Sequence, residues 1–286
     1  MSKVLVLGSS GMLGSSIRRV FESSAHVKTF TASRGKDSPD FHFSSISDIP
    51  SIIGNIKPDF ILNCTGIIKP YIDEGDPSSV RNAIEINSSL PYVLATESAK
   101  HDSRVIQIAT DCVFDGKRGN YDEDSNHSPS DVYGATKSLG EPNFRGFLNL
   151  RCSIVGHELF SNKSLLNWFL TQPKNSQLHG YTNHHWNGLT TDIFAQITYG
   201  VVTQGPWIDG TFHLVPSNSV SKFELLGLFR AYFSRDDLVI HPTESKNAID
   251  RRLITKFPEI NRNLWQYSEF KNSIPTIEDI ISTLKL

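Results

Sequence analysis

Two residues in the stretch DVYGATKSLGE, Tyr133 and Lys137, have the types and spacing needed for proton-transfer chemistry. Their separation of four positions places them one turn apart on one face of a helix. A free phenol, with a pKa of about 10, is a poor acid or base at neutral pH. An ammonium group ~4 Å away interacts with a phenolate by about 4 kcal/mol, enough to lower that pKa by up to ~3. The pair therefore predicts a tyrosine whose pKa is lowered toward the range in which general acid–base catalysis works.

The same spacing occurs in YSEFK, with Tyr267 and Lys271, so spacing alone does not identify chemistry. Context separates the two pairs. The apolar run RVIQIA, residues 104–109, predicts a strand that delivers Thr110 to its C-terminal end, where ligands bind in open α/β sheets. The first pair follows that strand closely enough to lie beside its end, whereas no comparable strand precedes the second pair. We expect Thr110 to orient a carbonyl oxygen for the first pair.

Three glycines, Gly8, Gly11 and Gly14, stand in LGSSGMLG between a predicted strand, residues 3–8, and a predicted helix, residues 11–23. A tight turn and a close approach of backbone to a pyrophosphate both favour glycine, and a helix N-terminus offers N–H donors. The GxxGxxG spacing is one residue wider than the usual dinucleotide fingerprint. We interpret the loop as a dinucleotide-binding loop, with a glycine-rich turn that only packs as the alternative.

The end of the next predicted strand, VKTFTAS, indicates which nicotinamide cofactor fits. An acidic residue there would bind the ribose 2′-hydroxyl, whereas an arginine accommodates a 2′-phosphate. Here Ser33, Arg34 and Lys36 occur with no carboxylate before Asp37. The pattern favours NADPH over NADH, with a solvated basic loop as the alternative reading.

The elements that position these residues alternate between strand and helix through the first half of the chain. Strands are predicted at residues 3–8, 27–33, 59–66, 104–111 and 146–156. The alternation implies right-handed βαβ units and a doubly wound parallel α/β sheet. Residues 78–100 predict a long helix, or a pair of helices interrupted near Pro91.

After residue 155 the alternation weakens, and the pattern predicts a smaller, more irregular α/β region. We expect residues 1–155 to form the cofactor-binding domain, completed by about residues 188–216. Residues 156–187 and 217–286 would then form the C-terminal substrate-binding region.

Composition narrows the possible partners and compartments. The 286 residues carry a formal net charge of −2, so no whole-chain positive field predicts nucleic-acid binding. No apolar run approaches the ~18 residues of a membrane span, and a first strand starting at Lys3 leaves no room for a signal peptide. Three dispersed cysteines, Cys64, Cys112 and Cys152, favour buried free thiols over a disulfide framework or zinc cluster. We expect a cytoplasmic protein.

The glycine loop, ATDCVFDG and DVYGATKSLGE together resemble the extended short-chain dehydrogenase/reductases. The most similar group is the dTDP-4-dehydrorhamnose reductase family, the RmlD-like sugar-nucleotide reductases. The resemblance covers essentially the whole chain and is strongest over residues 3–151. It implies a Rossmann-type fold, NADPH as reductant and a 4-keto-6-deoxy sugar nucleotide as substrate.

By residue, the resemblance implies Thr110, Tyr133 and Lys137 as the catalytic residues. Together with the loop and strand ends, it predicts a cofactor-binding set of Gly8, Ser10, Gly11, Met12, Leu13, Gly14, Ser33, Arg34, Asn63, Thr65, Gly66, Tyr133 and Lys137.

The chain departs from the family where the substrate is expected to bind. In the segment LRCSIVG, Ile154 stands where the family often has an aromatic residue. The segment FHFSSISD has hydroxyl side chains where the family usually has an acidic residue that contacts the adenine. The segment GYTNHHWNGLTT replaces the proline–threonine segment of the family. Neighbouring His184 and His185 would point to opposite faces of a strand, so no metal site is predicted. The cluster of residues 183–186 is expected to contact the sugar. The alternative is a structural turn in which Trp186 packs in the core.

Two arginines, Arg251 and Arg252, could bind the substrate diphosphate through their planar guanidinium groups. The family resemblance favours Arg252. The predicted substrate-binding set is Asp111, Asn183, His185, Trp186 and Arg252.

These features predict an NADPH-dependent reductase of the C4 keto group of a sugar nucleotide. One alternative is an epimerase or dehydratase of the same superfamily that retains NAD. Dehydratases need an additional acid–base pair near the threonine, and the residue after Asp111 is Cys112 rather than a carboxylate, which argues against dehydration. Another is a non-catalytic, NADP-binding regulatory subunit. A homodimer is one candidate assembly.

Overall fold

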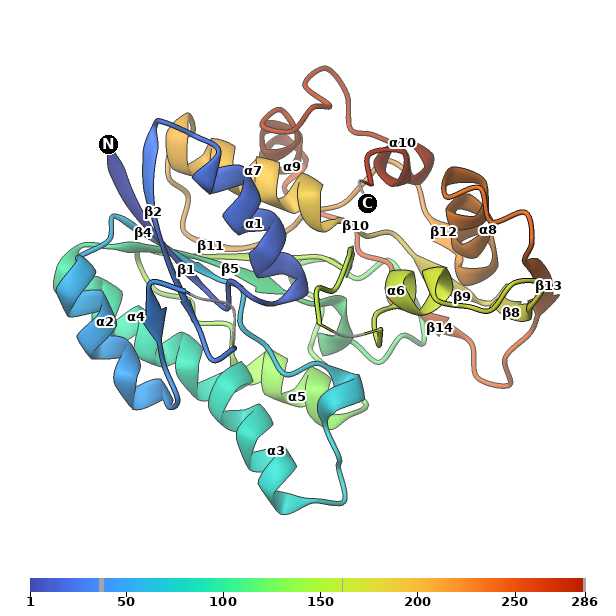
Figure 1. Cartoon of the computed structure of the whole chain (residues 1–286), viewed down its shortest axis with the longest axis horizontal. Helices are drawn as coiled ribbons and strands as arrows, with labels where there is room; N and C mark the ends of the chain where they lie inside the picture. The colour runs from blue at the N-terminus through green and yellow to red at the C-terminus, as the bar shows by residue number, and fades with distance from the viewer. Residues whose placement is uncertain (36–38, 161, 285–286) are drawn as a thin grey trace.

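Seven parallel strands form the central sheet of the computed structural model, which describes residues 1–35, 39–160 and 162–284 (Figure 1). In spatial order they are β11 (Gly210–His213), β6 (Phe147–Arg151), β5 (Arg104–Ala109), β4 (Phe60–Asn63), β1 (Ser2–Leu7), β2 (Val27–Ser33) and β3 (Phe41–His42). The strand order reverses between β1 and β4, which is where ligands bind in sheets of this type. The predicted doubly wound, Rossmann-type α/β fold is confirmed.

Two helical layers bury both faces of this sheet, which explains the unbroken apolar run of β1. Side chains alternate along the strand, so Val4 and Val6 pack in one core, and Leu5 and Leu7 in the other. The first layer consists of α1 (Met12–Glu22), α7 (Thr191–Thr203) and α9 (Pro258–Trp265). The opposite layer consists of α2 (Ile49–Ile56), α3 (Pro77–Ile84), α4 (Leu90–His101) and α5 (Val132–Leu139) (Figure 1).

The helix predicted over residues 78–100 is divided by a π-helical turn, Glu85–Ser89, rather than at Pro91. Pro91 lies in the first turn of α4, where a missing N–H costs little. The turn carries Asn87, whose side chain exchanges hydrogen bonds with the backbone of Ile67 at 2.8 and 2.9 Å. Asn87 also donates to Thr136 of α5 at 3.1 Å. The turn therefore ties α5 to the segment that follows β4.

The second half of the chain adds short sheets and helices beside the main sheet. Its elements are β7 (Ile154–Val155), α6 (Leu165–Leu170), β8 (Gln177–Tyr181), β9 (His184–Trp186), β10 (Leu189–Thr190), β12 (Val220–Ser221), α8 (Lys222–Tyr232), β13 (Val239–Thr243), β14 (Ile249–Asp250) and α10 (Ile277–Ile281). A separate hydrophobic core joins α6, α8 and α10 through Phe169, Phe229 and Ile277. By contrast, α7 and β11 return to the main sheet.

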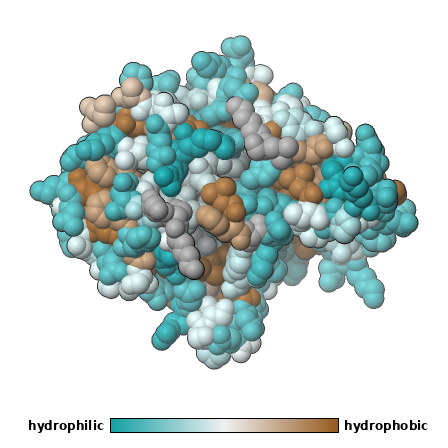
Figure 2. All heavy atoms as spheres, viewed as in Figure 1, coloured by the Kyte–Doolittle hydropathy of each residue, from teal (hydrophilic) through white to brown (hydrophobic). Residues whose placement is uncertain are grey.

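The visible face of the molecule is largely hydrophilic, and its apolar residues form small, separate patches (Figure 2). Among the described residues, no helix has both the length and the apolar character required to cross a membrane. Lys36 and Asp37, which entered the prediction of cofactor preference, lie outside the described residues.

Candidate active site

A cavity of about 500 Å³ lies at the C-terminal edge of β4 and β5, facing the glycine loop. The three predicted catalytic residues, Thr110, Tyr133 and Lys137, all line it. The predicted cofactor residues that line it are Ser10, Gly11, Met12, Leu13, Thr65 and Gly66. Residues separated by more than a hundred positions in the chain are thus brought into one cleft.

Two glycines allow a close approach of the α5 segment to the turn that follows β5 and to the π-helical turn. A Cβ at Gly134 would overlap the carbonyl oxygen of Cys112, and one at Gly140 would overlap that of Asn87. The N-terminus of α5 is capped by Asp131, whose side chain accepts from Gly134 N at 2.8 Å. The glycines of YGATKSLG therefore set the depth at which Tyr133 enters the cleft.

Tyr133 is half-buried and lines the cleft beside Thr110, whose hydroxyl donates to the Asp111 carboxylate at 3.2 Å. Burial raises the pKa of Tyr133 well above its usual value, and the neighbouring Cys112 and Asp111 reinforce the increase, while the nearby Thr110 hydroxyl opposes it. The expected fall in the pKa of Tyr133 is therefore wrong, because the phenol loses hydration on burial and the charged forms of its titratable neighbours are anions. The phenol is held as a protonated donor.

Lys137 is only 4% exposed, and its Nζ donates to the carbonyl oxygen of Ile108 at 3.0 Å. Burial lowers the pKa of Lys137 to about 8, although the nearby Glu141 and Cys152 act in the opposite direction. The ammonium is thus anchored to the strand that ends at Thr110, within the cleft that Tyr133 also lines.

The glycine loop has the geometry that a dinucleotide pyrophosphate requires. Gly8 has φ +79°, and its N–H donates to Ala32 of β2 at 2.8 Å. A Cβ at Gly14 would overlap the carbonyl oxygen of Gly8, so the loop and α1 can pack only with glycine there. Within the described chain, no side chain caps the N-terminus of α1, and its first turn contains no acidic residue. Its N–H groups and positive dipole end suit a phosphate.

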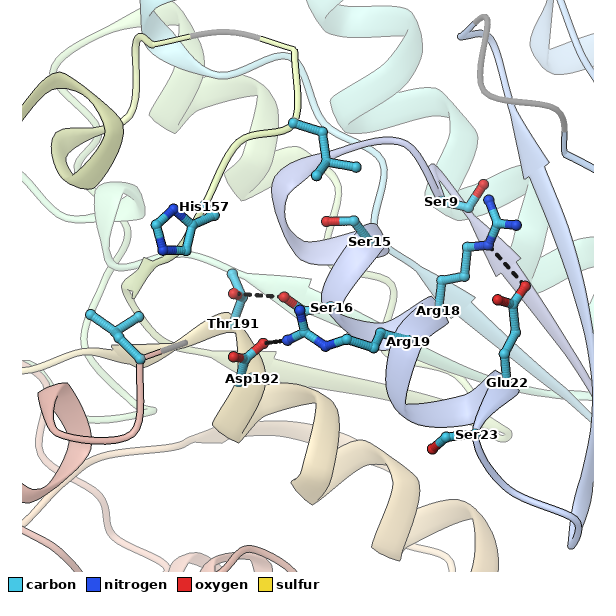
Figure 3. Close-up of a pocket in the computed structure, with 12 residues that line it drawn as sticks. Ser9, Ser15, Ser16, Arg18, Arg19, Glu22, Ser23, His157, Thr191 and Asp192 are labelled. Atoms are coloured by element: carbon cyan, nitrogen blue, oxygen red, sulfur yellow. Dashed lines mark hydrogen bonds and ion pairs between the residues drawn. The ribbon is translucent and has the colours of Figure 1, made fainter. Parts of the chain in front are cut away.

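A second cavity, of about 580 Å³, runs along the exposed flank of α1 (Figure 3). Ser9 of the glycine loop lines it, and its hydroxyl is buried with no hydrogen-bond partner among the described residues. Arg18 pairs with Glu22 at 2.8 Å, and Arg19 pairs with Asp192 of α7. None of the three predicted catalytic residues lines this cavity. The orphaned Ser9 hydroxyl, beside the end of β2, is available to a phosphate-bearing ligand.

The other predicted cofactor residues lie behind or beside the cleft. Asn63 is buried and accepts from the Thr65 N–H at 3.2 Å and its hydroxyl at 2.6 Å, so Asn63 holds the residue that reaches the cleft. Ser33 is buried at the end of β2, where its hydroxyl accepts from Gly35 at 3.2 Å. Arg34 is exposed, and its guanidinium lies 3.5 Å from the Asn82 side-chain oxygen.

Most predicted sugar-binding residues do not line the cleft as the described residues define it. Asn183 forms a structural turn, donating to Ser245 O at 2.8 Å. Trp186 is buried in the second core, and its indole N–H donates at 2.8 Å to Ser153, which does line the cleft. Arg252 is paired with Asp250 through contacts of 2.8 and 2.5 Å.

His185 is half-buried and lies on β9, next to Trp186, without lining the cleft. All three cysteines are free and line the cleft. Only Cys152 is fully buried, whereas Cys64 and Cys112 are half-buried because they follow the strand ends that open into the cavity. The prediction of buried thiols is thus confirmed for Cys152 alone.

Asp111 does line the cleft, and two cations act on its pKa: Arg251, which the sequence offered as the alternative to Arg252, and Lys222, which it did not single out. Burial raises the pKa of Asp111, and Arg251 and then Lys222 oppose that increase. Arg251 donates to Phe114 O at 2.8 Å, so this arginine, rather than Arg252, reaches the loop beside Asp111. The one sequence signal for Lys222 was its place at the start of a helix, where a cation opposes the dipole.

Comparison with known proteins identifies a family and a set of relatives. The chain matches the family described as the RmlD substrate binding domain over residues 2–252. It is 32% identical to methionine adenosyltransferase 2 subunit beta of Xenopus tropicalis over 145 residues, 49% of this chain and 41% of that protein. It is 28% identical to dTDP-4-dehydrorhamnose reductase of Aggregatibacter actinomycetemcomitans over 142 residues, 49% of this chain and 46% of that protein.

Each of these two alignments therefore spans less than half of the relative's length. Among solved structures, dTDP-4-dehydrorhamnose reductase of Bacillus anthracis in complex with NADP superposes with a TM-score of 0.76. The match has 18% identity and covers 99% of this chain and 98% of the other, which shows a shared fold.

Proposed function

This chain belongs to the RmlD substrate binding domain family, and from that premise we propose that it is an NADPH-dependent sugar-nucleotide reductase. Its substrate would be a 4-keto-6-deoxy sugar nucleotide, reduced at the C4 carbonyl group. The observation that carries the proposal is that Thr110, Tyr133 and Lys137 line one cleft together with residues of the glycine loop. This arrangement provides a proton donor and an oxygen-orienting hydroxyl beside a dinucleotide site.

The proposed mechanism gives a separate role to each of the three side chains. NADPH, when bound, supplies the hydride that reaches C4 and becomes NADP⁺. Tyr133 transfers its proton to the oxygen at C4, completing the hydroxyl group, and is later reprotonated from solvent. Thr110 donates a hydrogen bond that orients the carbonyl oxygen and then stabilises the tyrosinate. Lys137 stabilises the same tyrosinate by its charge and is placed to hold the nicotinamide ribose.

We also propose that two parts of the chain bind the two ligands. Residues 1–155, with about 188–216, would hold NADPH, using the glycine loop, Ser9, Ser33 and Arg34. Residues 156–187 and 217–286 would complete the sugar-nucleotide site. The contribution of α7 and β11 to the main sheet supports assigning their segment to the first unit.

The proposal is tested by NADPH oxidation. Purified protein is mixed with NADPH and a panel of 4-keto-6-deoxy sugar nucleotides generated by 4,6-dehydration, and loss of nicotinamide absorbance is followed. We expect turnover with at least one member. Absence of turnover with all of them would reject the reductase assignment.

The relatives that are named as methionine adenosyltransferase subunits favour a second candidate, a non-catalytic NADP-binding subunit. It predicts NADPH binding without turnover on any sugar nucleotide, and co-purification with a methionine adenosyltransferase catalytic chain. An NAD-retaining epimerase is distinguished separately, since denaturing the purified protein would then release NAD rather than NADP. The intact trio of Thr110, Tyr133 and Lys137 supports the reductase over the subunit.

A further inference from the structure

Polar side chains of adjacent strands form a row across the main sheet, on the face that the helical layer containing α5 covers. They stand at matching register positions of β4, β5, β6 and β11, and are Asn63, Gln107, Asn149 and Thr211. The residues two positions earlier on β4, β5 and β6 point to the same face and belong to its hydrophobic core: Ile61, Val105 and Phe147. Asn63 is 3% exposed, and Gln107 and Asn149 are fully buried. This polar row therefore lies directly against an apolar core.

Hydrogen bonds join the polar row from one end to the other. Asn63 donates to the side-chain oxygen of Gln107 at 2.7 Å, and Gln107 donates to that of Asn149 at 3.0 Å. Asn149 in turn donates to the Thr211 hydroxyl at 3.2 Å and to Pro142 O at 2.8 Å. Each amide donates to the next, so reversing the Gln107 amide would set N–H groups of neighbouring residues against each other. The orientation of Gln107 is thus fixed by both of its neighbours.

Gln107 also attaches the polar row to the end of α5. Its amide donates at 2.6 Å to the carbonyl oxygen of Gly140, the residue that caps the C-terminus of α5. A carbonyl at a helix C-terminus has no partner within the helix, so the Gln107 side chain supplies one. Lys137 of α5 is bonded to the backbone of Ile108, the next residue of β5. These two contacts hold α5 against β5.

The opposite end of the polar row reaches the cleft. Asn63 accepts from both the N–H and the hydroxyl of Thr65, and Thr65 lines the cleft together with Tyr133. A continuous series of hydrogen bonds therefore runs from a residue of the proposed cofactor side to the helix that carries the proposed proton donor. Gln107 lies at the centre of that series.

A buried amide is an expensive way to fill space in a core. It is unfavourable unless its N–H and C=O groups are bonded, and a single missing partner leaves the others unsatisfied. An apolar side chain at position 107, like that of Val105 before it, would pack in the core without this requirement. A fully bonded polar network inside a core specifies one arrangement of the elements that it joins.

We propose that Gln107 is a positioning residue of the cleft. Through Asn63 and the Gly140 carbonyl it fixes Thr65 and α5 relative to each other, and so sets the distance between the bound cofactor and the phenol of Tyr133. The part of this inference that concerns the reaction rests on the proposed function. The placement of α5 by Gln107 involves only residues of this chain and stands without it.

The placement of Tyr133 is measured first, in the absence of substrate. The protein is labelled with fluorotyrosine, the Tyr133 signal is assigned by its loss in Tyr133→Phe, and its ¹⁹F chemical shift is recorded. Gln107→Met keeps the length of the side chain and removes the amide. Because α5 then loses its contact at Gly140, the Tyr133 signal should move by more than its linewidth.

Ile106→Ala is the matched control. Ile106 is the neighbour of Gln107 on β5, is equally buried, and packs in the core on the opposite face of the sheet. Ile106→Ala should lower the free energy of unfolding in urea and leave the Tyr133 signal in place. A Tyr133 signal that keeps its wild-type position in Gln107→Met, or that moves equally in Ile106→Ala, overturns the proposal.

The functional consequence is then read from kcat and KM for a sugar nucleotide that wild type reduces. Gln107→Met should lower kcat about tenfold to hundredfold and change KM less, because a misplacement of ~1 Å can cost ~10²-fold in rate. Ile106→Ala should retain the wild-type kcat. An unchanged kcat in Gln107→Met would overturn the role in the reaction.

Should wild type reduce no sugar nucleotide, the proposed function fails, while the ¹⁹F spectra still decide the placement of α5. Gln107→Glu replaces Gln107→Met if the latter does not fold, since it keeps the oxygen that accepts from Asn63 and loses the N–H groups that reach Gly140 and Asn149.

Discussion

The Nζ atom of Lys137 lies 3.0 Å from the carbonyl oxygen of Ile108, so the buried lysine of α5 is bonded to β5, the strand directly before Thr110. This contact links the helix that carries Tyr133 to the strand that directly precedes Thr110. It also leaves an ammonium group inside the protein, which has consequences for stability as well as for chemistry.

Replacing Lys137 with methionine should stabilise the protein while abolishing turnover. Burial lowers the pKa of Lys137 from 10.5 to about 8, so the unfolded chain binds more protons between those values. Wild-type stability therefore rises with pH across that window, and the full penalty applies below about pH 8. We expect Lys137→Met to gain on the order of 2 kcal/mol at pH 7, measured by urea unfolding. The gain in unfolding free energy should be smaller at pH 10 than at pH 7. An equal gain at the two pH values would show that it does not come from the buried charge.

Removing the Tyr133 hydroxyl should reduce turnover and spare cofactor binding. Tyr133→Phe should lower kcat by roughly 10²–10⁴-fold, since a positioned acid contributes about that much. NADPH affinity, measured by fluorescence titration, should change little. Tyr267→Phe is the matched control, because Tyr267 and Lys271 share the spacing without the cleft. Near-wild-type kcat in Tyr133→Phe would remove this residue from the mechanism.

A methyl group at Gly134 should displace α5 from the edge of the sheet. The added Cβ would overlap Cys112 O, so Gly134→Ala should lose about 1–3 kcal/mol of unfolding free energy and most of its turnover. Gly227 of α8 offers the control, since no described atom lies within 4 Å of a Cβ there. Gly227→Ala should be neutral or stabilising by up to ~1 kcal/mol. Equal effects in the two variants would show that the close approach of α5 is unimportant.

Arg34 should discriminate between the two nicotinamide cofactors. Its side chain is exposed at the end of β2, so Arg34→Ala should leave stability unchanged. We expect the preference for NADPH over NADH to fall about tenfold, the equivalent of one charge-assisted hydrogen bond of ~1.4 kcal/mol. Calorimetric titration with both cofactors measures the ratio, with the exposed Arg145→Ala as the control. Equal affinities in wild type would reject the NADP assignment.

A buried histidine should make the fold sensitive to acid. His213 Nδ1 donates to Ile254 O at 2.6 Å and its Nε2 accepts from Arg151 at 2.6 Å, which requires a neutral ring. Burial, with Arg151, lowers the pKa of His213 from 6.5 to about 4, so the unfolded state binds the extra proton between those values.

Stability should therefore fall, on the order of 2 kcal/mol, as pH decreases from about 6.5 to about 4. The test is urea unfolding across this range for wild type, His213→Gln and the exposed His26→Gln. His213→Gln should flatten the dependence, and His26→Gln should retain it. A dependence that persists in His213→Gln would place the acid sensitivity elsewhere.

Much of the fold and part of the site could be predicted because their signals are local. The run KVLVLG followed by spaced glycines specifies a strand, a turn and a helix start through backbone conformation alone. Tyr133 and Lys137 are neighbours on one helix whatever surrounds it. The residues expected to bind the sugar were harder to predict. Asn183 and Trp186 have side chains of types that often bind ligands, but here Asn183 bonds within a turn and Trp186 packs in a hydrophobic core.

What the sequence determined by itself was the order of the elements, the glycine turn between β1 and α1 and the pairing of Tyr133 with Lys137 on one helix, because each depends on residues close together in the chain. Only the tertiary structure decided the electrostatics. It showed that burial raises the pKa of Tyr133, and that Arg251 and Lys222, more than a hundred residues further along the chain, oppose the increase that burial causes in the pKa of Asp111. Hydration and distant charges depend on packing in three dimensions, and no local pattern encodes them.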